Sequence, residues 1–175
     1  MRSFLFAGLL FLSAPAAGEV VSADAHGFEV ANSVSLVIPV GQAYAAFGRV
    51  GAWWSDSHTY SGKAANMKLP LQAGGCFCEA LPENGGGVEH MRVVVVQPGE
   101  RIVMTGSLGP VLFEAASGVM DVRFERIAGG ANVTLNYRAA GFAKGNADQL
   151  APLVDAVLAE QLKRYRAYAA KRGGK

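Results

Sequence analysis

Charged side chains are scarce in this 175-residue chain: they make up 17% of it, against roughly 25% in an average soluble domain. The formal net charge is only +2. Nucleic-acid-binding domains normally carry a strongly basic surface, so this composition argues against a nucleic-acid partner. Hydrophobic residues reach 51%, which excludes disorder as the main state because such a chain can bury a core.

The chain also lacks any run of eighteen or more apolar residues, the length that a membrane-spanning helix requires. Its N-terminal apolar stretch, Phe4 to Leu12, is about nine residues long and follows the positively charged Arg2, which is typical of a secretory signal peptide. The small residues that follow predict cleavage after Ala16 or Ala17, with Ala23 as a later alternative. The other interpretation is a helical N-terminal extension that stays attached.

A signal peptide within residues 1–23 leaves residues 24–175 as one mature domain of ordinary size. We then expect the protein in the bacterial periplasm or outside the cell, with no stable membrane insertion after cleavage. A domain of this length buries about two-thirds of its unfolded surface, so it needs no disulfide or metal to fold. No cofactor is expected.

Only two cysteines are present, and Cys76 and Cys78 stand two residues apart in a predicted strand. Their Cα atoms would be about 6.6 Å apart, which is too far for a disulfide unless a bulge or strain shortens the distance. Unpaired thiols, a labile disulfide and a metal site all remain open. A metal site would also need His58 and His90, which nothing in the sequence places beside the cysteines.

Catalytic signatures are absent as well. The sequence has no Gly-x-Ser-x-Gly, no His-Glu-x-x-His and no phosphate-binding glycine loop. It therefore identifies no catalytic residue and leaves enzymatic activity open.

What the sequence does contain is β-strand patterning with many turns. Glycine is abundant, at 22 residues, which favours strand ends and turns over a helical bundle. Two short helices are predicted after the first strand, over residues 40–47 and 52–54. Period-two runs between turn signals predict strands over residues 28–38, 67–71, 75–81, 88–96, 101–105, 111–127 and 132–140.

The C-terminus changes to a helical period. Between residues 148 and 170, apolar side chains from Leu150 to Ala169 recur at three- and four-residue spacings, so one stripe of a long helix is buried. The sequence thus predicts an α+β fold, a curved antiparallel sheet of about six to seven strands wrapped around this helix. One helix cannot fill the whole concave face, so large side chains or a cavity must occupy the rest.

Local motifs accompany this element order. Trp53-Trp54 closes the short helices, Gly74-Gly75-Cys76-Phe77 opens a strand, and a valine-rich strand with a proline turn runs over residues 93–102. Gly129-Gly130 marks the last hairpin. Together these features resemble the SRPBCC (START-like, helix-grip) superfamily, in particular its polyketide cyclase and heat-shock ATPase activator-like group.

The resemblance implies a pocket between sheet and helix that holds an apolar or amphipathic small molecule, without a fixed catalytic set. The activator role does not suit an exported protein, because its partner is cytosolic. Tyr137 is the best candidate for a polar group in the pocket. For Tyr137 and for one of the two tryptophans, the other interpretation is that the side chain packs in the core and contacts no ligand. The candidate pocket residues are Trp53, Trp54, Tyr60, Met91, Met104, Phe113, Met120, Tyr137, Gln161 and Tyr165.

Three functions follow. The leading hypothesis is an exported protein that binds a small hydrophobic ligand. The first alternative is a cyclase, dehydratase or isomerase acting on an aromatic or polyketide-like substrate, with Tyr137, His58 or His90 as general acid or base. It requires that at least one of these groups reaches the cavity. The second alternative is a redox or metal-handling module built on Cys76 and Cys78.

Overall fold

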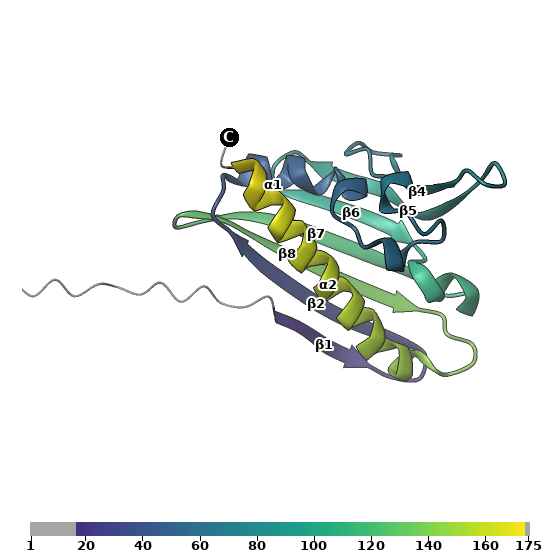
Figure 1. The fold of residues 1–175 in the computed structure, drawn as a ribbon. Helices are drawn as coiled ribbons and strands as arrows, with labels where there is room; N and C mark the ends of the chain where they lie inside the picture. The colour runs from purple at the N-terminus through teal and green to yellow at the C-terminus, as the bar shows by residue number, and fades with distance from the viewer. Residues whose placement is uncertain (1–16, 174–175) are drawn as a thin grey trace, which may run out of the picture.

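The computed structural model describes residues 17–173, and its main feature is a curved antiparallel sheet with one long helix across it (Figure 1). The eight strands are Ala17–Ala23 (β1), Gly27–Leu36 (β2), Met67–Lys68 (β3), Cys76–Leu81 (β4), Gly86–Gln97 (β5), Arg101–Gly106 (β6), Ser117–Ile127 (β7) and Gly130–Ala140 (β8). Their order in the sheet is β1-β2-β8-β7-β6-β5-β4-β3. The α+β class and the helix-grip arrangement are thereby confirmed.

The long helix α2 spans Ala147–Gly173 and packs against β1, β2 and the short helix α1 (Val40–Phe47). Its predicted apolar stripe faces the sheet, since Leu158, Leu162 and Tyr165 are all buried. No helix within residues 17–173 is long and apolar enough to cross a membrane.

The sheet has one strand more than the six to seven expected, and the addition is β1. It pairs antiparallel with β2, with Val20 opposite Val30. Residues 17–23 thus belong to the sheet, although the sequence placed them in the signal peptide. Cleavage after Ala16 or Ala17 would leave β1 essentially whole, whereas cleavage after Ala23 would remove it. The apolar stretch and the cleavage signal before residue 17 lie outside the described residues.

The connection after α1 runs along α2 through three single-turn 3₁₀ helices, η1 (Val50–Ala52), η2 (Asp56–His58) and η3 (Ala64–Asn66). The second short helix, predicted over residues 52–54, shares only Ala52 with η1, and Trp53 and Trp54 lie in the turn that follows. Arg164 of α2 fixes this connection, because its guanidinium donates hydrogen bonds to the carbonyl oxygens of Trp53 (3.0 Å) and Trp54 (3.2 Å).

The predicted strand over residues 111–127 is interrupted. Its first residues lie in a 3₁₀ helix, η4 (Gly109–Glu114), which has Pro110 in its first turn and is followed by Ala115 in the left-handed conformation. Only β7 continues as a strand. Gly118 lies in regular pairing, where a Cβ atom would come within 2.5 Å of the Arg138 carbonyl oxygen.

A β-bulge in β5 decides which side chains reach the interior. Phe77 of β4 pairs with Met91 and Cys78 pairs with Glu89, so His90 is an extra residue without a partner on β4. His90 and Met91 are consecutive and both buried. Strict alternation would place His90 and Met91 on opposite faces of β5, but the bulge interrupts the two-residue period and both side chains are buried.

A second register shift follows in β5, between Val93 and Val95. It turns Val95 outward, to 41% exposure, although alternation had placed it inside. Gly106 lies opposite Met91 with φ of 150°, and a Cβ atom there would come within 2.6 Å of the His90 carbonyl oxygen and 2.7 Å of the Met91 Cα. The chain beside the first bulge therefore requires glycine.

We predict that Gly106→Ala lowers the free energy of unfolding by about 1–3 kcal/mol, because the added methyl group meets backbone atoms that cannot move aside. Urea unfolding measures the change. The matched control is Gly41→Ala in α1, where a Cβ atom meets nothing within 4 Å. The control should be neutral or stabilising by up to about 1 kcal/mol. Equal effects of the two substitutions would contradict this account of the bulge.

Candidate functional site

A pocket of about 410 Å³ lies between α2, the loop around η2, η4 and the inner side of the sheet; we call it the inner pocket. Most of its wall is apolar, and the polar contributions come from the loop and from one residue of β5. The apolar residues are Trp54, Met67, Leu108, Pro110, Phe113, Leu150, Leu153, Val154, Val157 and Leu158. The polar residues are Ser57, His58, Thr59, Tyr60 and His90.

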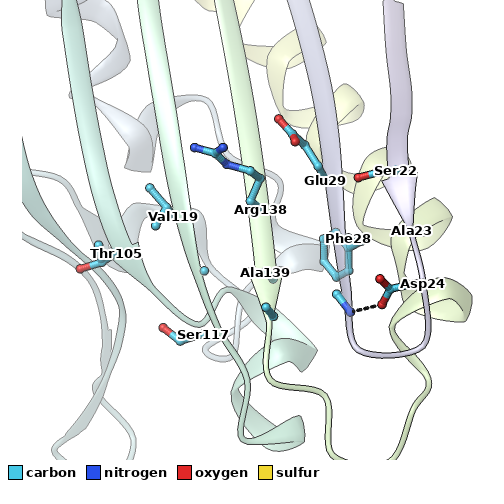
Figure 2. A pocket seen from close by; sticks show the side chains of 13 residues that line it. Ser22, Ala23, Asp24, Phe28, Glu29, Thr105, Ser117, Val119, Arg138 and Ala139 are labelled. Carbon is cyan, nitrogen blue, oxygen red and sulfur yellow. Dashed lines mark hydrogen bonds between the residues drawn. The ribbon is translucent and has the colours of Figure 1, made fainter.

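A second hollow, of about 620 Å³, lies over the opposite face of the sheet (Figure 2). Glu29, Val119 and Arg138 line it from neighbouring strands, and in sequence they alternate with residues buried beneath the helix. The inner pocket is the better candidate site, because ligand sites combine mainly apolar walls with a few convergent polar groups.

Beneath the polar side of the inner pocket, Glu79 of β4 is almost completely buried. Its carboxylate accepts hydrogen bonds from the backbone N–H groups of Tyr60 (3.1 Å) and Ser61, and it lies 3.1 Å from Nε2 of His90. One carboxylate thus holds both the loop above it and the bulged histidine beside it.

The protonation of this pair follows from its surroundings. Burial alone would raise the pKa of Glu79, but the hydrogen bonds from Ser61, Tyr60 and His90 outweigh it and leave the pKa below its ordinary value. Burial lowers the pKa of His90, and Glu79 opposes this only in part. Near neutral pH the pair is therefore a carboxylate and a neutral imidazole. The imidazole N–H is at Nε2, since a carboxylate can only accept, and Nδ1 is an acceptor.

His58 carries its ring hydrogen on the same nitrogen, but here Nδ1, and not Nε2, is engaged by a neighbouring side chain. The backbone N–H of Ser55 donates to Oε1 of Gln161 (2.8 Å), and Nε2 of Gln161 lies 2.8 Å from Nδ1 of His58. The amide nitrogen must be the donor here, so Nδ1 accepts and the hydrogen of the neutral ring is at Nε2. Trp54 anchors the same loop by donating its indole N–H to the His58 carbonyl oxygen (2.9 Å).

Of the ten pocket residues expected from the sequence, the structure places three in the wall of the inner pocket: Trp54, Tyr60 and Phe113. The other seven do not line it. They are large side chains buried in the core. These are Trp53, Met91, Met104, Met120, Tyr137, Gln161 and Tyr165.

The polar atoms of the buried core residues form hydrogen bonds within the protein. The Tyr137 hydroxyl accepts the backbone N–H of Leu108 (3.3 Å), and burial raises the pKa of Tyr137 to about 12. Tyr165 donates to the carbonyl oxygen of Ala43 (2.8 Å). Gln161, Tyr165 and Tyr137 therefore each have a different hydrogen-bond partner.

Glu79 is the principal residue that sequence reasoning missed. A signal existed, since Glu79 stands two residues after the inward-facing Phe77 and alternation places both on the same side of β4. The helix residues of the pocket were identified only as a buried stripe, and a periodic pattern cannot separate a pocket wall from a packed core. Of the residues in η4, the sequence indicated only Phe113 as part of the pocket wall.

The cysteines lie on the outer side of β4, away from Phe77 and Glu79. Cys76 and Cys78 form a disulfide, with Cα atoms 5.2 Å apart, where the pairing of β4 with β5 shifts register. Within residues 17–173, three metal-ligating groups come together only at these cysteines and Glu89, and there the two sulfur atoms are bonded to each other. His58 and His90 line the inner pocket instead, so the four-residue metal site is not assembled.

Comparison with known proteins shows similarity in structure only. No protein-family model matches the chain, and no curated protein matches it. An uncharacterized protein from Rhizobium leguminosarum has a TM-score of 0.61 at 15% identity, over 90% of this chain and 99% of its own. The di-domain ARO/CYC protein StfQ of the steffimycin biosynthetic pathway has a TM-score of 0.55 at 15% identity, over 86% of this chain and 53% of its own.

CalU16 from Micromonospora echinospora has a TM-score of 0.50 at 13% identity, over 91% of this chain and 92% of its own. The chain shares the helix-grip fold with these structures. Identities this low establish the helix-grip fold and leave the chemistry to the site itself.

The buried pair predicts how stability depends on pH. Because the pKa of His90 is lowered on folding, the unfolded chain binds a proton that the native state does not, and stability falls as the pH drops below about 6.5. The lowered pKa of Glu79 stabilises the fold above its ordinary pKa, and this contribution is lost as the pH falls through the native value. Both effects destabilise the protein in acid.

We predict that His90→Gln, which keeps an N–H for Glu79, reduces the loss of stability between about pH 7 and pH 5. The measurement is the urea unfolding midpoint at both pH values for the wild type and the variant. Lys163→Ala, on the exposed side of α2, is the control and should retain the wild-type pH dependence. A variant with the full wild-type loss would show that His90 does not contribute to it.

Proposed function

We propose that this protein binds a small hydrophobic or amphipathic molecule in the inner pocket and does so as an exported binding protein. The observation that carries the proposal is the pocket itself, a cavity of about 410 Å³ with a mainly aliphatic and aromatic wall. This volume is within the usual range for small-molecule sites. Export rests on the N-terminal sequence pattern alone.

The composition of the wall indicates the kind of ligand. Leucine and valine side chains of α2 face Phe113 and Trp54, so an apolar body gains roughly 25 cal/mol for each Å² that it removes from water. His58 and His90 offer one donor and one acceptor nitrogen in otherwise apolar surroundings. A ligand with a ring system and one or two oxygen atoms fits this combination.

A second candidate is an enzyme of the cyclase, dehydratase or isomerase type acting in the same pocket. The observation that favours it is that both histidines proposed as acid or base line the cavity. That StfQ, an ARO/CYC protein, has the same fold is compatible with this candidate, although fold does not determine reaction.

Filling the pocket tests the binding proposal. We predict that Val157→Trp, in the α2 wall, weakens binding of the fluorescent probe anilinonaphthalene sulfonate at least about tenfold, a loss of about 1.4 kcal/mol. The matched control is Val119→Trp in the outer hollow, which should bind the probe like the wild type.

Fluorescence titration gives both affinities, and circular dichroism confirms that both variants are folded. A folded Val157→Trp protein with unchanged affinity would contradict the proposal. Loss of binding in Val119→Trp alone would place the site in the outer hollow. Native mass spectrometry of protein purified from its own compartment would then identify the natural ligand by its mass.

A further inference from the structure

We propose that His90 and His58 form an acid–base pair that removes a proton from a carbon next to the carbonyl group of an apolar ketone in the inner pocket. The inference rests on the proposed binding function and adds the substrate class and the role of each residue. Four observations carry it: the bulge at His90, the burial of Glu79, the fixed orientation of His58 and the apolar wall.

The bulge turns the imidazole of His90 to the inner side of the sheet, where regular alternation beside Met91 would not place it. His90 is 3% exposed, and its ring lies between those of Tyr60 (centroids 5.7 Å apart) and Phe77 (5.3 Å). It nevertheless lines the pocket, while Nε2 is engaged by Glu79. Among the described residues, none forms a hydrogen bond with Nδ1. A bulge that re-aims a side chain in this way is typical of strands beside functional sites.

Glu79 is a positioning residue in this proposal, because it contacts His90 and not the ligand. It keeps the hydrogen of the neutral ring on Nε2, which leaves the lone pair of Nδ1 free to accept a proton. When Nδ1 takes the proton, the ring becomes cationic beside a buried carboxylate, and the attraction stabilises that charge. The two backbone N–H donors keep the carboxylate ionised and in place.

His58 supplies the complementary group. The chain of hydrogen bonds from Ser55 through Gln161 fixes the hydrogen of the neutral ring on Nε2, so His58 can donate to a carbonyl oxygen. The pocket thus offers one acceptor nitrogen, from His90, and one donor N–H, from His58. A carbon acid next to a carbonyl group needs both, since it loses a proton from carbon while negative charge develops on oxygen.

The step balances without a cofactor. The C–H bond breaks and its proton goes to Nδ1 of His90, while the electron pair forms the carbon–carbon double bond of the enolate. The carbonyl π electrons move to the oxygen, and a hydrogen bond from the His58 Nε2–H stabilises the negative charge that develops there. Return of the proton from His90 to the same carbon, or to a conjugated one, regenerates the neutral His90 ring and completes an exchange or an isomerisation.

The test uses β-tetralone as the probe, a ketone with two fused rings and acidic C–H groups beside its carbonyl. The full-length protein is incubated with it in D₂O, and NMR follows deuterium entry at the carbon next to the carbonyl. We expect exchange above the buffer rate in the wild type and a loss of about a hundredfold or more of this acceleration in His90→Gln. Tetralone affinity should change only a few-fold, because the apolar wall is intact.

Two further variants separate chemistry from structure. Glu79→Gln should shift the pH profile of the exchange, because the neutral amide no longer favours the protonated ring; a purely structural role would leave the profile unchanged. His26→Gln alters a histidine that does not line the inner pocket and should keep the wild-type rate.

The wild-type pH profile gives a test without any substitution. Exchange should decline in acid, as His90 becomes protonated. Tetralone binding without acceleration, or unchanged acceleration in His90→Gln, would overturn the acid–base pair and leave the binding function standing. If tetralone does not bind and Val157→Trp leaves probe binding unchanged, the binding function fails and this inference fails with it.

Discussion

A single buried carboxylate organises the functional end of this molecule. A charge removed from water is stable in a protein only when other groups satisfy it, and Glu79 has three such groups: the backbone N–H donors of Tyr60 and Ser61 and the ring of His90. The first two fix the loop over the pocket, and the third fixes the bulged strand beneath it. Glu79 is thus the group that joins the loop to the bulged strand, while Gln161 and Arg164 hold the loop from the side of α2.

The concave face of the sheet is divided accordingly. At one end, four aromatic rings pack together with neighbouring centroids 5.3–5.7 Å apart and fill the space below α2: Phe47, Trp53, Phe124 and Tyr165. At the other end the loop is tied to Glu79 on the sheet side and to α2 through Gln161. This end is held together by hydrogen bonds and not by packed apolar side chains, so a cavity remains between the loop, the sheet and α2.

Local periodicity in the sequence predicted the long helix, most strands and the helix-grip arrangement. It could do so because the spacing of apolar residues shows which face of each element is buried. Periodicity did not predict strand β1 over residues 17–23, because its small residues are compatible both with a cleavage region and with an edge strand. It failed for His90 because a bulge depends on pairing with another strand and has no local signature. Tyr137 and Tyr165 were expected in the pocket because alternation gives the inner face of the sheet and not the place where packing is incomplete.

The central claim is that Glu79 holds His90 as a neutral ring with its hydrogen on Nε2 and its lone pair on Nδ1. A long-range ¹H–¹⁵N NMR spectrum of the histidine rings in the folded protein tests this most directly, because the two nitrogens differ strongly in chemical shift when only one is protonated. Near neutral pH the account predicts a protonated Nε2 and an unprotonated Nδ1, with titration below the ordinary imidazole pKa. A hydrogen on Nδ1, or averaged shifts like those of a free histidine, would contradict it.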